Sequence, residues 1–181
     1  LGCETEELPA FVVMTSSDEA KSCGQLFFDY YWGSGFLPSR FQGVKFRNTG
    51  EPVPYLANPP GISRAARRAL LDDLAVMNAK HRADYGDPEI DTRIASYEMA
   101  FQMQASVPDL IDFSDEPKHV LERYGPDVHK KGSFAFNCLV ARRLLERGTR
   151  FVQLMHAGWD QHSNLHTQLE IQCRDTQGPS A

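Results

Sequence analysis

The amino-acid sequence predicts an α/β fold, and three observations lead to this prediction. Apolar segments rich in β-branched and aromatic residues lie near the two ends of the chain, at residues 8–15 and 149–155. Helical spacing of apolar residues dominates the sequence between 62 and 147. The last helical stretch passes through Gly148 directly into the second apolar segment, as in the return arm of an α/β unit.

The first apolar segment, residues 8–15, is short and has no polar residue in its interior. This pattern is typical of a strand that is buried on both faces of a sheet. Residues 16–61 follow without a regular period and contain many glycines and prolines. We interpret them as an irregular lobe with at most short strands, such as residues 44–46, because their aromatic content argues against disorder.

Residues 62–147 are predicted to be mainly helical. Ser63 has the residue type of an N-cap, and apolar residues recur at helical spacing up to about His81, so we expect a first helix that stops at residues 86–88. A second apolar stripe predicts a helix from about Ile90 that ends before Val107-Pro108.

The last two predicted helices flank residues 125–133. One begins at residues 114–117, with Ser114 as its cap, and ends at 124–126. Gly148 is predicted to end the other helix, and residues 149–155 follow as a strand. An apolar stripe and a group of C-terminal arginines define that helix: Phe134, Cys138, Ala141 and Leu145, with Arg142, Arg143 and Arg147.

Length and composition indicate one globular domain, or a piece of a larger one. The 181 residues are 41% hydrophobic and 24% charged, and the formal net charge is −5. This acidic balance argues against nucleic acid and anionic membranes as partners, because both select clustered Lys and Arg. No apolar run approaches the roughly 20 residues of a membrane helix. The four cysteines form no Cys-x-x-Cys pair, so we expect no structural zinc site, and we expect Cys138 to be a buried thiol.

A candidate site follows the second strand. Ligands of open α/β sheets bind at the carboxyl ends of the strands, and the strand at 149–155 runs directly into His156, Asp160, His162 and His166. Asp160 and His162, two residues apart on an extended backbone, point to the same side, whereas His162 and His166 share a face if a helix begins near Ser163. Imidazole and carboxylate together suit zinc, manganese or iron, which can activate water or neutralise ester oxygens.

Other interpretations of these polar residues stay open. The histidines can belong to a solvated surface loop in which Asp160 caps a helix, and no glutamate of a zinc protease accompanies them. The hydroxyls of Thr15, Ser16 and Ser17 follow the first strand, where a nucleophile can sit, but we interpret them as turn residues. The aromatic residues 30–32 can line a substrate cleft, but we expect them to pack the irregular lobe. His81, His119 and His129 are expected on the surface.

Several motifs resemble a family of bacterial, chiefly planctomycete, proteins, the DUF1501 family of unknown function. The family is usually described as sulfatase-like, within the alkaline phosphatase superfamily. The resemblance covers the whole chain and keeps the order of the motifs. They are residues 8–15, Trp32-Gly33-Ser34-Gly35-Phe36-Leu37-Pro38, Gln42-Gly43-Val44, Asn58-Pro59-Pro60-Gly61, residues 97–104, Ser114-Asp115-Glu116-Pro117, residues 150–154 and Gly158-Trp159-Asp160-Gln161-His162.

The resemblance implies an α/β/α sandwich of the phosphatase and sulfatase type, with the aromatic-rich lobe as an irregular insertion. It implies hydrolysis of a sulfate or phosphate ester, on a small molecule or a glycan, with divalent metals at the strand ends. Asp160 and His162 would be metal ligands, with His166 a weaker candidate, and His156 would be a further ligand or a general acid/base. Zinc, manganese, calcium and magnesium are all compatible with this implied site, and a periplasmic or cell-surface location is implied.

The chain also departs from the family pattern. An aspartate-glycine-glycine motif, a Gly-Glu-Phe-Gly-Arg-Thr-like segment and an Asp-His-His-like segment are typical of relatives, and none occurs in residues 1–181. We therefore expect an internal segment of a single sulfatase-like domain, in which residues 149–181 form the strand and metal-loop region. The Cys-x-Pro-x-Arg motif of formylglycine sulfatases is absent from these residues as well.

Two further functions are compatible with the sequence. A catalytically inactive member of the fold would serve as a binding or scaffold protein, for example for cell-surface glycans, with residues 30–61 as its contact surface. Alternatively, the chain is a structural α/β unit whose histidine loop binds nothing.

Overall fold

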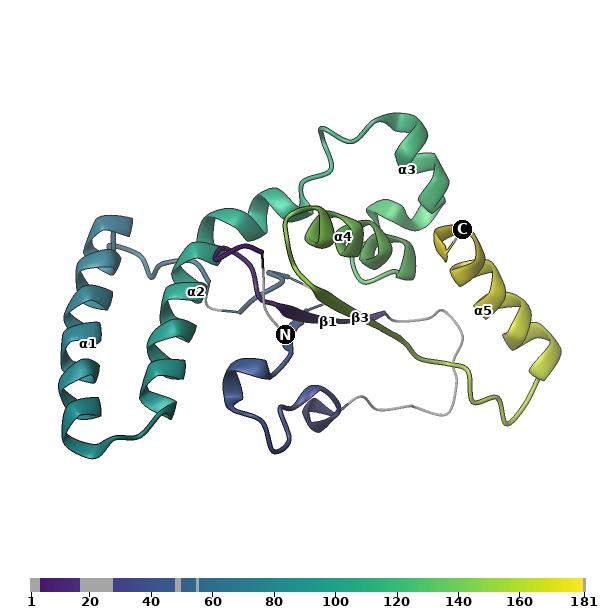
Figure 1. Ribbon diagram of the computed structural model, residues 1–181. Coiled ribbons are helices and arrows are strands. Elements are labelled where there is room, and N and C mark those ends of the chain that lie inside the picture. Colours follow the sequence, from purple (N-terminus) through teal and green to yellow (C-terminus); the bar gives the residue numbers. More distant parts are fainter. Residues whose placement is uncertain (1–3, 17–27, 48–49, 55, 181) are drawn as a thin grey trace.

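The computed structural model describes residues 4–16, 28–47, 50–54 and 56–180. These residues form five α-helices and a parallel sheet of three strands, β1 (Phe11–Ser16), β2 (Val44–Phe46) and β3 (Phe151–His156). The strand order is β2-β1-β3, so β1 is central and all three carboxyl ends lie at one edge. Figure 1 labels β1 and β3. The predicted α/β class and the short strand at 44–46 are confirmed.

The central strand β1 is buried on both faces, as its sequence predicts. Val12 and Met14 point into the main core, beneath helix α4 (Phe134–Glu146), which packs on β1 and β3. Val13, on the opposite face, has no exposed surface and contacts the position of Gly43 in the irregular lobe. The aromatic residue Trp32 of that lobe is also buried, so the lobe covers the second face of the sheet.

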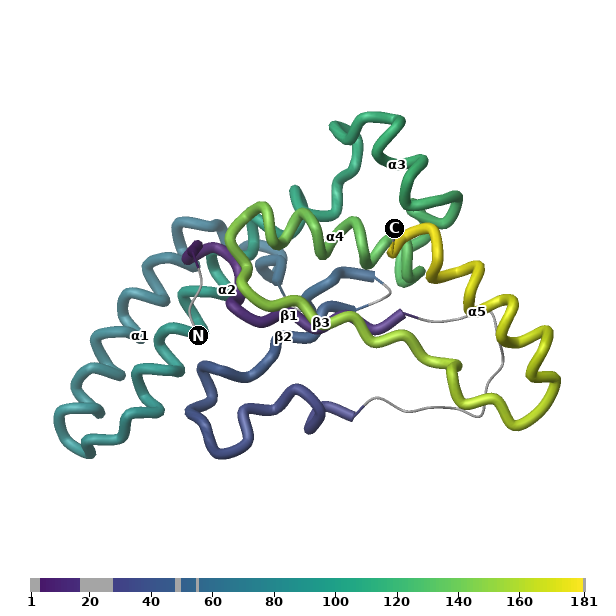
Figure 2. The backbone as a smooth tube through the Cα atoms, turned by 45° about the vertical axis from the view of Figure 1, so that its right-hand side comes forward, coloured from purple at the N-terminus to yellow at the C-terminus, as the bar shows by residue number. Residues whose placement is uncertain are grey.

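The other helices extend the fold on both sides of this centre. α1 (Arg64–Tyr85) and α2 (Glu89–Ile111) form an antiparallel pair on one side of the sheet. On the other side, α3 (Lys118–Tyr124) and α5 (Leu165–Ser180) pack against each other and against α4 (Figure 2). Short 3-10 helices lie at Asp29–Trp32, Ser39–Phe41 and Pro126–His129. None of the helices in the described ranges is both long and apolar enough to cross a bilayer.

The boundaries of α1 agree with the prediction, but those of α2 do not. Ser63 Oγ accepts a hydrogen bond from the Ala66 amide, which caps α1. α2 continues through Pro108 to Ile111 instead of ending before it. Proline removes a backbone hydrogen bond and costs about 3 kcal/mol inside a helix. Val107 and Leu110 are almost completely buried in the core, and burial of two such side chains, worth about 1.5–3 kcal/mol each, offsets that cost.

The predicted N-terminus of α3 is also wrong, because residues 114–117 have other partners. The Ser114 amide donates to Asp112 Oδ1, and the Glu116 carboxylate binds two arginines of α4. The helix therefore begins only at Lys118, with Pro117 as its N-cap residue.

The predicted helix at the end of this region, α4, exists but faces another way. Leu139, Val140 and Leu144 form its buried face, whereas Leu145 of the predicted stripe is 53% exposed. The helix packs against both the sheet and α2, so its buried face is set by two neighbours at once. Its end is as predicted: the Gly148 amide donates to the Leu145 carbonyl and the Thr149 amide to the Leu144 carbonyl, in a Schellman motif.

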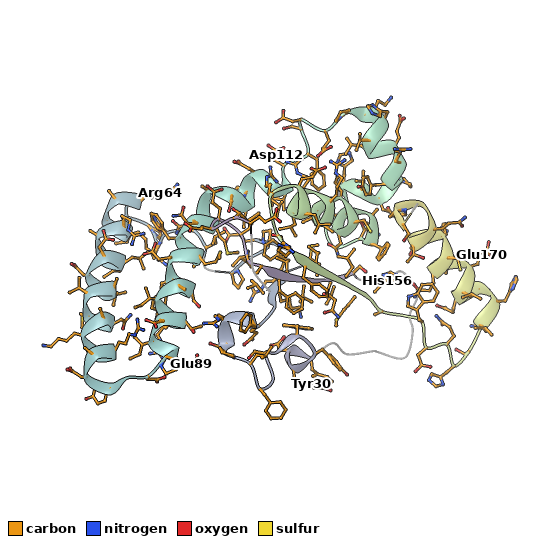
Figure 3. All side chains as sticks on the ribbon, in the orientation of Figure 1. Tyr30, Arg64, Glu89, Asp112, His156 and Glu170 are labelled. Atoms are coloured by element: carbon orange, nitrogen blue, oxygen red, sulfur yellow. The ribbon has the colours of Figure 1, made fainter. Side chains whose placement is uncertain are left out.

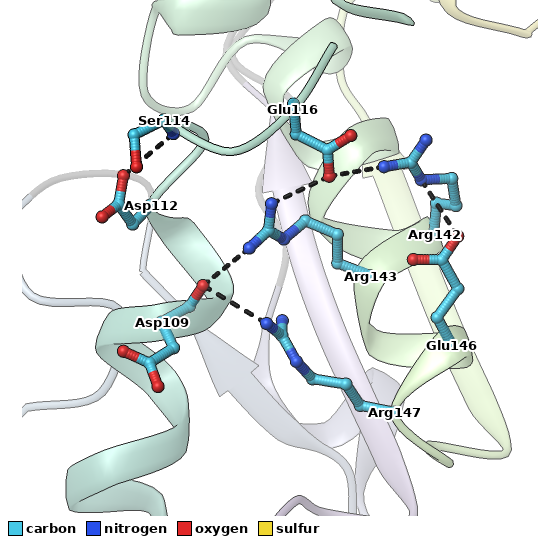
Figure 4. Close-up of polar contacts among 8 residues, drawn as sticks. All are labelled: Asp109, Asp112, Ser114, Glu116, Arg142, Arg143, Glu146 and Arg147. Atoms are coloured by element: carbon cyan, nitrogen blue, oxygen red, sulfur yellow. Dashed lines mark hydrogen bonds and ion pairs between the residues drawn. The ribbon is translucent and has the colours of Figure 1, made fainter.

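The arginines at the C-terminal end of α4 join three elements (Figure 4). Arg142 and Arg143 donate to Glu116 Oε1 at 2.6 and 2.8 Å, and Arg143 also donates to the Asp109 carbonyl in the last turn of α2. Arg147 adds a longer bond, 3.4 Å, to the same carbonyl. These bonds fix the ends of α2 and α4 and the approach to α3 relative to one another.

Candidate active site

Ser16 and His156 are paired in register at the carboxyl ends of β1 and β3. Paired residues of parallel neighbours direct their side chains to the same face of a sheet, so the hydroxyl and the imidazole meet. Ser16 Oγ lies 2.6 Å from His156 Nδ1, a short hydrogen bond. A serine and a histidine thus occupy the edge of the sheet at which α/β proteins bind their ligands.

The other ring nitrogen of His156 faces α5. His156 Nε2 lies 2.6 Å from Gln172 Oε1, and Gln172 Nε2 donates to the Ala157 carbonyl at 3.2 Å. A carbonyl can only accept, so this second bond fixes the orientation of the Gln172 amide and turns Oε1 to the ring. In a neutral imidazole His156 Nε2 then carries the proton, and Nδ1 is left to accept the proton of Ser16.

The surroundings hold this group in place. Gln172 is completely buried and Ser16 is 4% exposed. The Phe134 ring meets the imidazole edge-on at 5.3 Å, and Asn137 Nδ2 donates to the Thr15 carbonyl, so α4 secures the end of β1. Figure 3 shows His156 at the end of β3, between the sheet and α5.

A small cavity adjoins the imidazole on the side of α4. Its volume is about 20 Å³, the space of one water molecule, and polar side chains form part of its wall. The lining residues are Asp127, Lys130, Ser133, Phe134, Ala135, His156 and Asp175. The cavity can hold a water next to His156 but is too small for an ester substrate.

The two predicted metal ligands lie together in the loop after β3. Asp160 Oδ2 is 3.2 Å from His162 Nε2, and both side chains are mainly exposed. Gly158 has a positive φ of 99° and accepts a bond from the Gln161 side chain, which shapes the turn that brings the pair together. Two ligands of one tetrahedral ion with bonds of about 2.1 Å are about 3.4 Å apart, so the observed separation suits a shared divalent cation.

The structure does not bring His166 to this pair. α5 begins at Leu165, so His162 lies outside the helix and the face that it was predicted to share with His166 does not form. Across the described ranges, no three His, Cys, Asp or Glu side chains are grouped so that they could hold a metal ion. Within these ranges the predicted site therefore consists of the Asp160–His162 pair alone, and a metal ion bound there would need further ligands from water or from groups outside these ranges.

Sequence reasoning found His156 but missed both of its partners. Ser16 was interpreted as a turn residue, whereas it is the last residue of β1, and Ser17 lies outside the described residues. Gln172 carried no signal, because a glutamine in an amphipathic helix is usually exposed. The only signal for Ser16 was its place at the end of a strand, the same place that His156 has in β3.

The other residues singled out in the sequence are the aromatic residues 30–32 of the lobe, three further histidines and Cys138. Trp32 packs the lobe as expected, while Tyr30 and Tyr31 are exposed, at 71% and 50%. His81, His119 and His129 are exposed, as predicted. Cys138 is half-buried, and burial raises the pKa of its thiol to about 11.

Comparison with known proteins gives one match. The model of a family described as a protein of unknown function, DUF1501, matches residues 1–181. No curated protein and no solved structure matches the chain. Since the match extends over the entire sequence, the chain belongs to the DUF1501 family.

Proposed function

We propose that the protein is a metal-dependent hydrolase of sulfate or phosphate esters, with its reaction centre at the carboxyl ends of β1 and β3. One observation carries the proposal. The hydrogen-bonded pair of Ser16 and His156 stands at the end of β3, and the loop that follows directly presents Asp160 and His162 at the separation of two metal ligands. The sulfatase-like fold, a sandwich of the alkaline phosphatase type, is part of this proposal.

The residues have distinct roles in the proposed site. Asp160 Oδ2 and His162 Nε2 hold a divalent cation, which when bound would neutralise the charge on ester oxygens. His156 has both ring nitrogens engaged, which favours a role in proton transfer over one as a ligand. His166 remains a predicted ligand that the loop at 157–164 would have to bring closer.

Metal content measured by elemental mass spectrometry tests the metal site. We expect stoichiometric zinc or manganese in the protein and its loss in an Asp160→Ala/His162→Ala double variant. The matched control is His81→Ala/Asp84→Ala, which removes an exposed histidine and an exposed aspartate from α1. Loss of metal in the first variant alone supports the proposal, whereas equal metal content in all three proteins, or none in any, contradicts it.

An activity screen tests the reaction. p-Nitrophenyl sulfate and p-nitrophenyl phosphate represent the two ester classes, and release of p-nitrophenol is followed by absorbance. We expect turnover of at least one of them to fall to background in Asp160→Ala/His162→Ala and to persist in His81→Ala/Asp84→Ala. Binding of metal without turnover of either ester would favour an inactive member of the fold.

One observation favours glycan binding as a second candidate function. Phe28, Tyr30 and Tyr31 form an exposed cluster, in which Phe28 and Tyr30 are stacked 5.6 Å apart and the two tyrosine rings lie at 4.4 Å. Exposed aromatic faces present large apolar area at low entropic cost, which suits the apolar faces of sugars. Retarded migration in gels containing sulfated glycans, lost in Tyr30→Ala/Tyr31→Ala but kept in Tyr85→Ala on α1, would support it.

A further inference from the structure

We propose that Ser16 is the nucleophile of the reaction, that His156 is its general base and that Gln172 positions the imidazole. The inference rests on the proposed ester hydrolysis and specifies its course: the phosphoryl or sulfuryl group would pass through a covalent bond to Ser16 Oγ. Three features carry it, namely the distance between hydroxyl and imidazole, the proton arrangement that Gln172 imposes, and the enclosure of the group.

The first feature is the hydrogen bond itself. A serine hydroxyl becomes nucleophilic when an adjacent base accepts its proton, and the required separation is about 2.6–3.2 Å. Ser16 Oγ is 2.6 Å from His156 Nδ1, while its other acceptor, the Met155 carbonyl, is 3.4 Å away. The proton of Ser16 is therefore directed to the imidazole.

The second feature is the choice of ring nitrogen. Because the Gln172 amide donates to the Ala157 carbonyl, its Oε1 accepts from His156 Nε2, and Nδ1 is the unprotonated nitrogen. The arrangement has the order nucleophile, base and orienting group that activated serines require. Among the described side chains, the Ser16 hydroxyl is the one at hydrogen-bond distance from His156 Nδ1.

The third feature is the enclosure. Ser16 and Gln172 are buried, and Phe134 lies against the imidazole, so the three hydrogen-bonded side chains are held in one arrangement. Ser16 and His156 belong to paired strands of one sheet, so the hydroxyl that would give its proton to the imidazole is held next to it.

The proton and the bonds balance in two steps. In the first, Ser16 Oγ forms a bond to phosphorus or sulfur, its proton passes to His156 Nδ1, and the bond to the leaving alcohol breaks on the opposite side, where solvent protonates the alkoxide. In the second, water attacks from that side and gives a proton to solvent. The bond to Ser16 Oγ then breaks, and His156 Nδ1 returns the proton to it.

Diisopropyl fluorophosphate provides a test that needs neither substrate nor metal. Ser16 Oγ would form a bond to phosphorus, fluoride would leave, and the serine proton would pass through His156 to solvent. We expect a single stable adduct, which peptide mass spectrometry locates on Ser16. In His156→Gln the rate of adduct formation should fall at least about a hundredfold, the usual contribution of a general base. Ser106, whose hydroxyl donates to the Glu7 carbonyl, is the control, and Ser106→Ala should react like the parent protein.

A second variant keeps the test decisive if His156→Gln does not fold. The thiol introduced by Ser16→Cys lies beside His156 Nδ1, whereas burial raises the pKa of the Cys138 thiol to about 11, so the new thiol should react with iodoacetamide faster than Cys138, and below pH 8 in particular. A folded protein without an adduct on Ser16, or with a thiol no faster than Cys138, would overturn the assignment and leave the Ser16–His156 bond a structural link.

The outcome is independent of the test of the metal site. An adduct on Ser16 together with no bound metal would retain the nucleophile and reject the metal-dependent hydrolase. Bound metal that depends on Asp160 and His162, with an inert Ser16, would retain the hydrolase and reject the covalent step.

Discussion

Ser16 Oγ and His156 Nδ1 are 2.6 Å apart although 140 positions separate the two residues in the sequence. The register of β1 and β3 produces this contact, because it pairs the last residue of one strand with the last residue of the other. Gln172 completes the arrangement from α5, so three elements converge on one imidazole. The backbone pairing of the parallel sheet thus places Ser16 and His156 side by side at its carboxyl edge, and α5 adds Gln172.

Replacement of Gln172 by alanine should destabilise the protein and allow the proton of the neutral His156 ring to occupy either nitrogen. The fully buried amide satisfies both His156 Nε2 and the Ala157 carbonyl, and a buried polar group left without a partner costs about 1–3 kcal/mol. We expect the free energy of unfolding in urea to fall by about 2–4 kcal/mol. Nitrogen NMR of the imidazole should show the proton on Nε2 in the parent protein and a mixture of tautomers in Gln172→Ala.

Gln177→Ala is the matched control on the same helix. Gln177 is exposed, so its removal should change neither the unfolding midpoint nor the tautomer. An unchanged tautomer in a folded Gln172→Ala protein would show that Gln172 does not position the ring.

The elements of the fold that could be predicted from the sequence are each encoded by neighbouring residues, whereas α5 lies in a region for which a strand and a metal loop were expected. The apolar run at 8–15, the cap at Ser63 and the glycine at 148 each specify a local structure. The limits of such prediction appear where tertiary contacts decide. α2 continues through Pro108 because the residues next to this proline are buried in the core. The buried face of α4 is set by its packing against both the sheet and α2.

The same distinction applies to the candidate site. Asp160 and His162 are close in sequence and were predicted together, and the structure joins them. Ser16 and Gln172 could not be assigned, since their meeting with His156 depends on strand register and on the packing of α5. Local spacing carries no information about either.

Glu116→Gln should lower stability near neutral pH and lose this effect in acid. The hydrogen bond from Arg142, supported by Arg143, holds the pKa of the Glu116 carboxyl below its ordinary value. A carboxyl whose pKa is lowered by folding stabilises the native state at pH values above its unfolded pKa of about 4.3. That stability disappears as the pH falls through the lower native pKa. We expect a loss of about 1–3 kcal/mol at pH 7, because the carboxylate is largely buried.

Urea denaturation at pH 7 and at pH 3 measures this difference. Glu122→Gln is the control, since Glu122 pairs with Lys118 at 3.6 Å on the exposed surface of α3, and such pairs contribute little. A loss of stability in Glu116→Gln that is equal at both pH values would indicate that the ionised carboxylate is not what holds α4 to the segment before α3.

Cys138 and Cys173 should differ strongly in their reaction with iodoacetamide. Burial raises the pKa of the Cys138 thiol to about 11, so almost none of it is thiolate at pH 8, whereas Cys173 is exposed on α5. Peptide mass spectrometry after a timed reaction should find Cys173 alkylated at least tenfold faster. In urea the two rates should converge, and equal rates in the folded protein would contradict the burial of Cys138.

Gly43→Ala should destabilise the contact between the irregular lobe and the sheet. A Cβ atom at this position would lie 2.8 Å from the Phe11 ring and 2.9 Å from Val13 Cγ2, and Val13 has no exposed surface to move into. Overpacking of this kind costs about 1–3 kcal/mol, which urea denaturation can measure. Gly178→Ala is the control of opposite sign, since no atom lies within 4 Å of a Cβ at that helical position, and it should be neutral or stabilising.

A double-mutant cycle identifies the cause of the loss in Gly43→Ala. Phe11→Leu removes the ring atoms that the new methyl group would meet, and the ring lies at a half-buried position where a smaller side chain can be accommodated. In the Phe11→Leu background, Gly43→Ala should therefore cost less than it does alone, with a coupling of about 0.5–2 kcal/mol between the two sites. Strict additivity would mean that the clash is with Val13 alone, or that the backbone of the lobe yields instead of the ring.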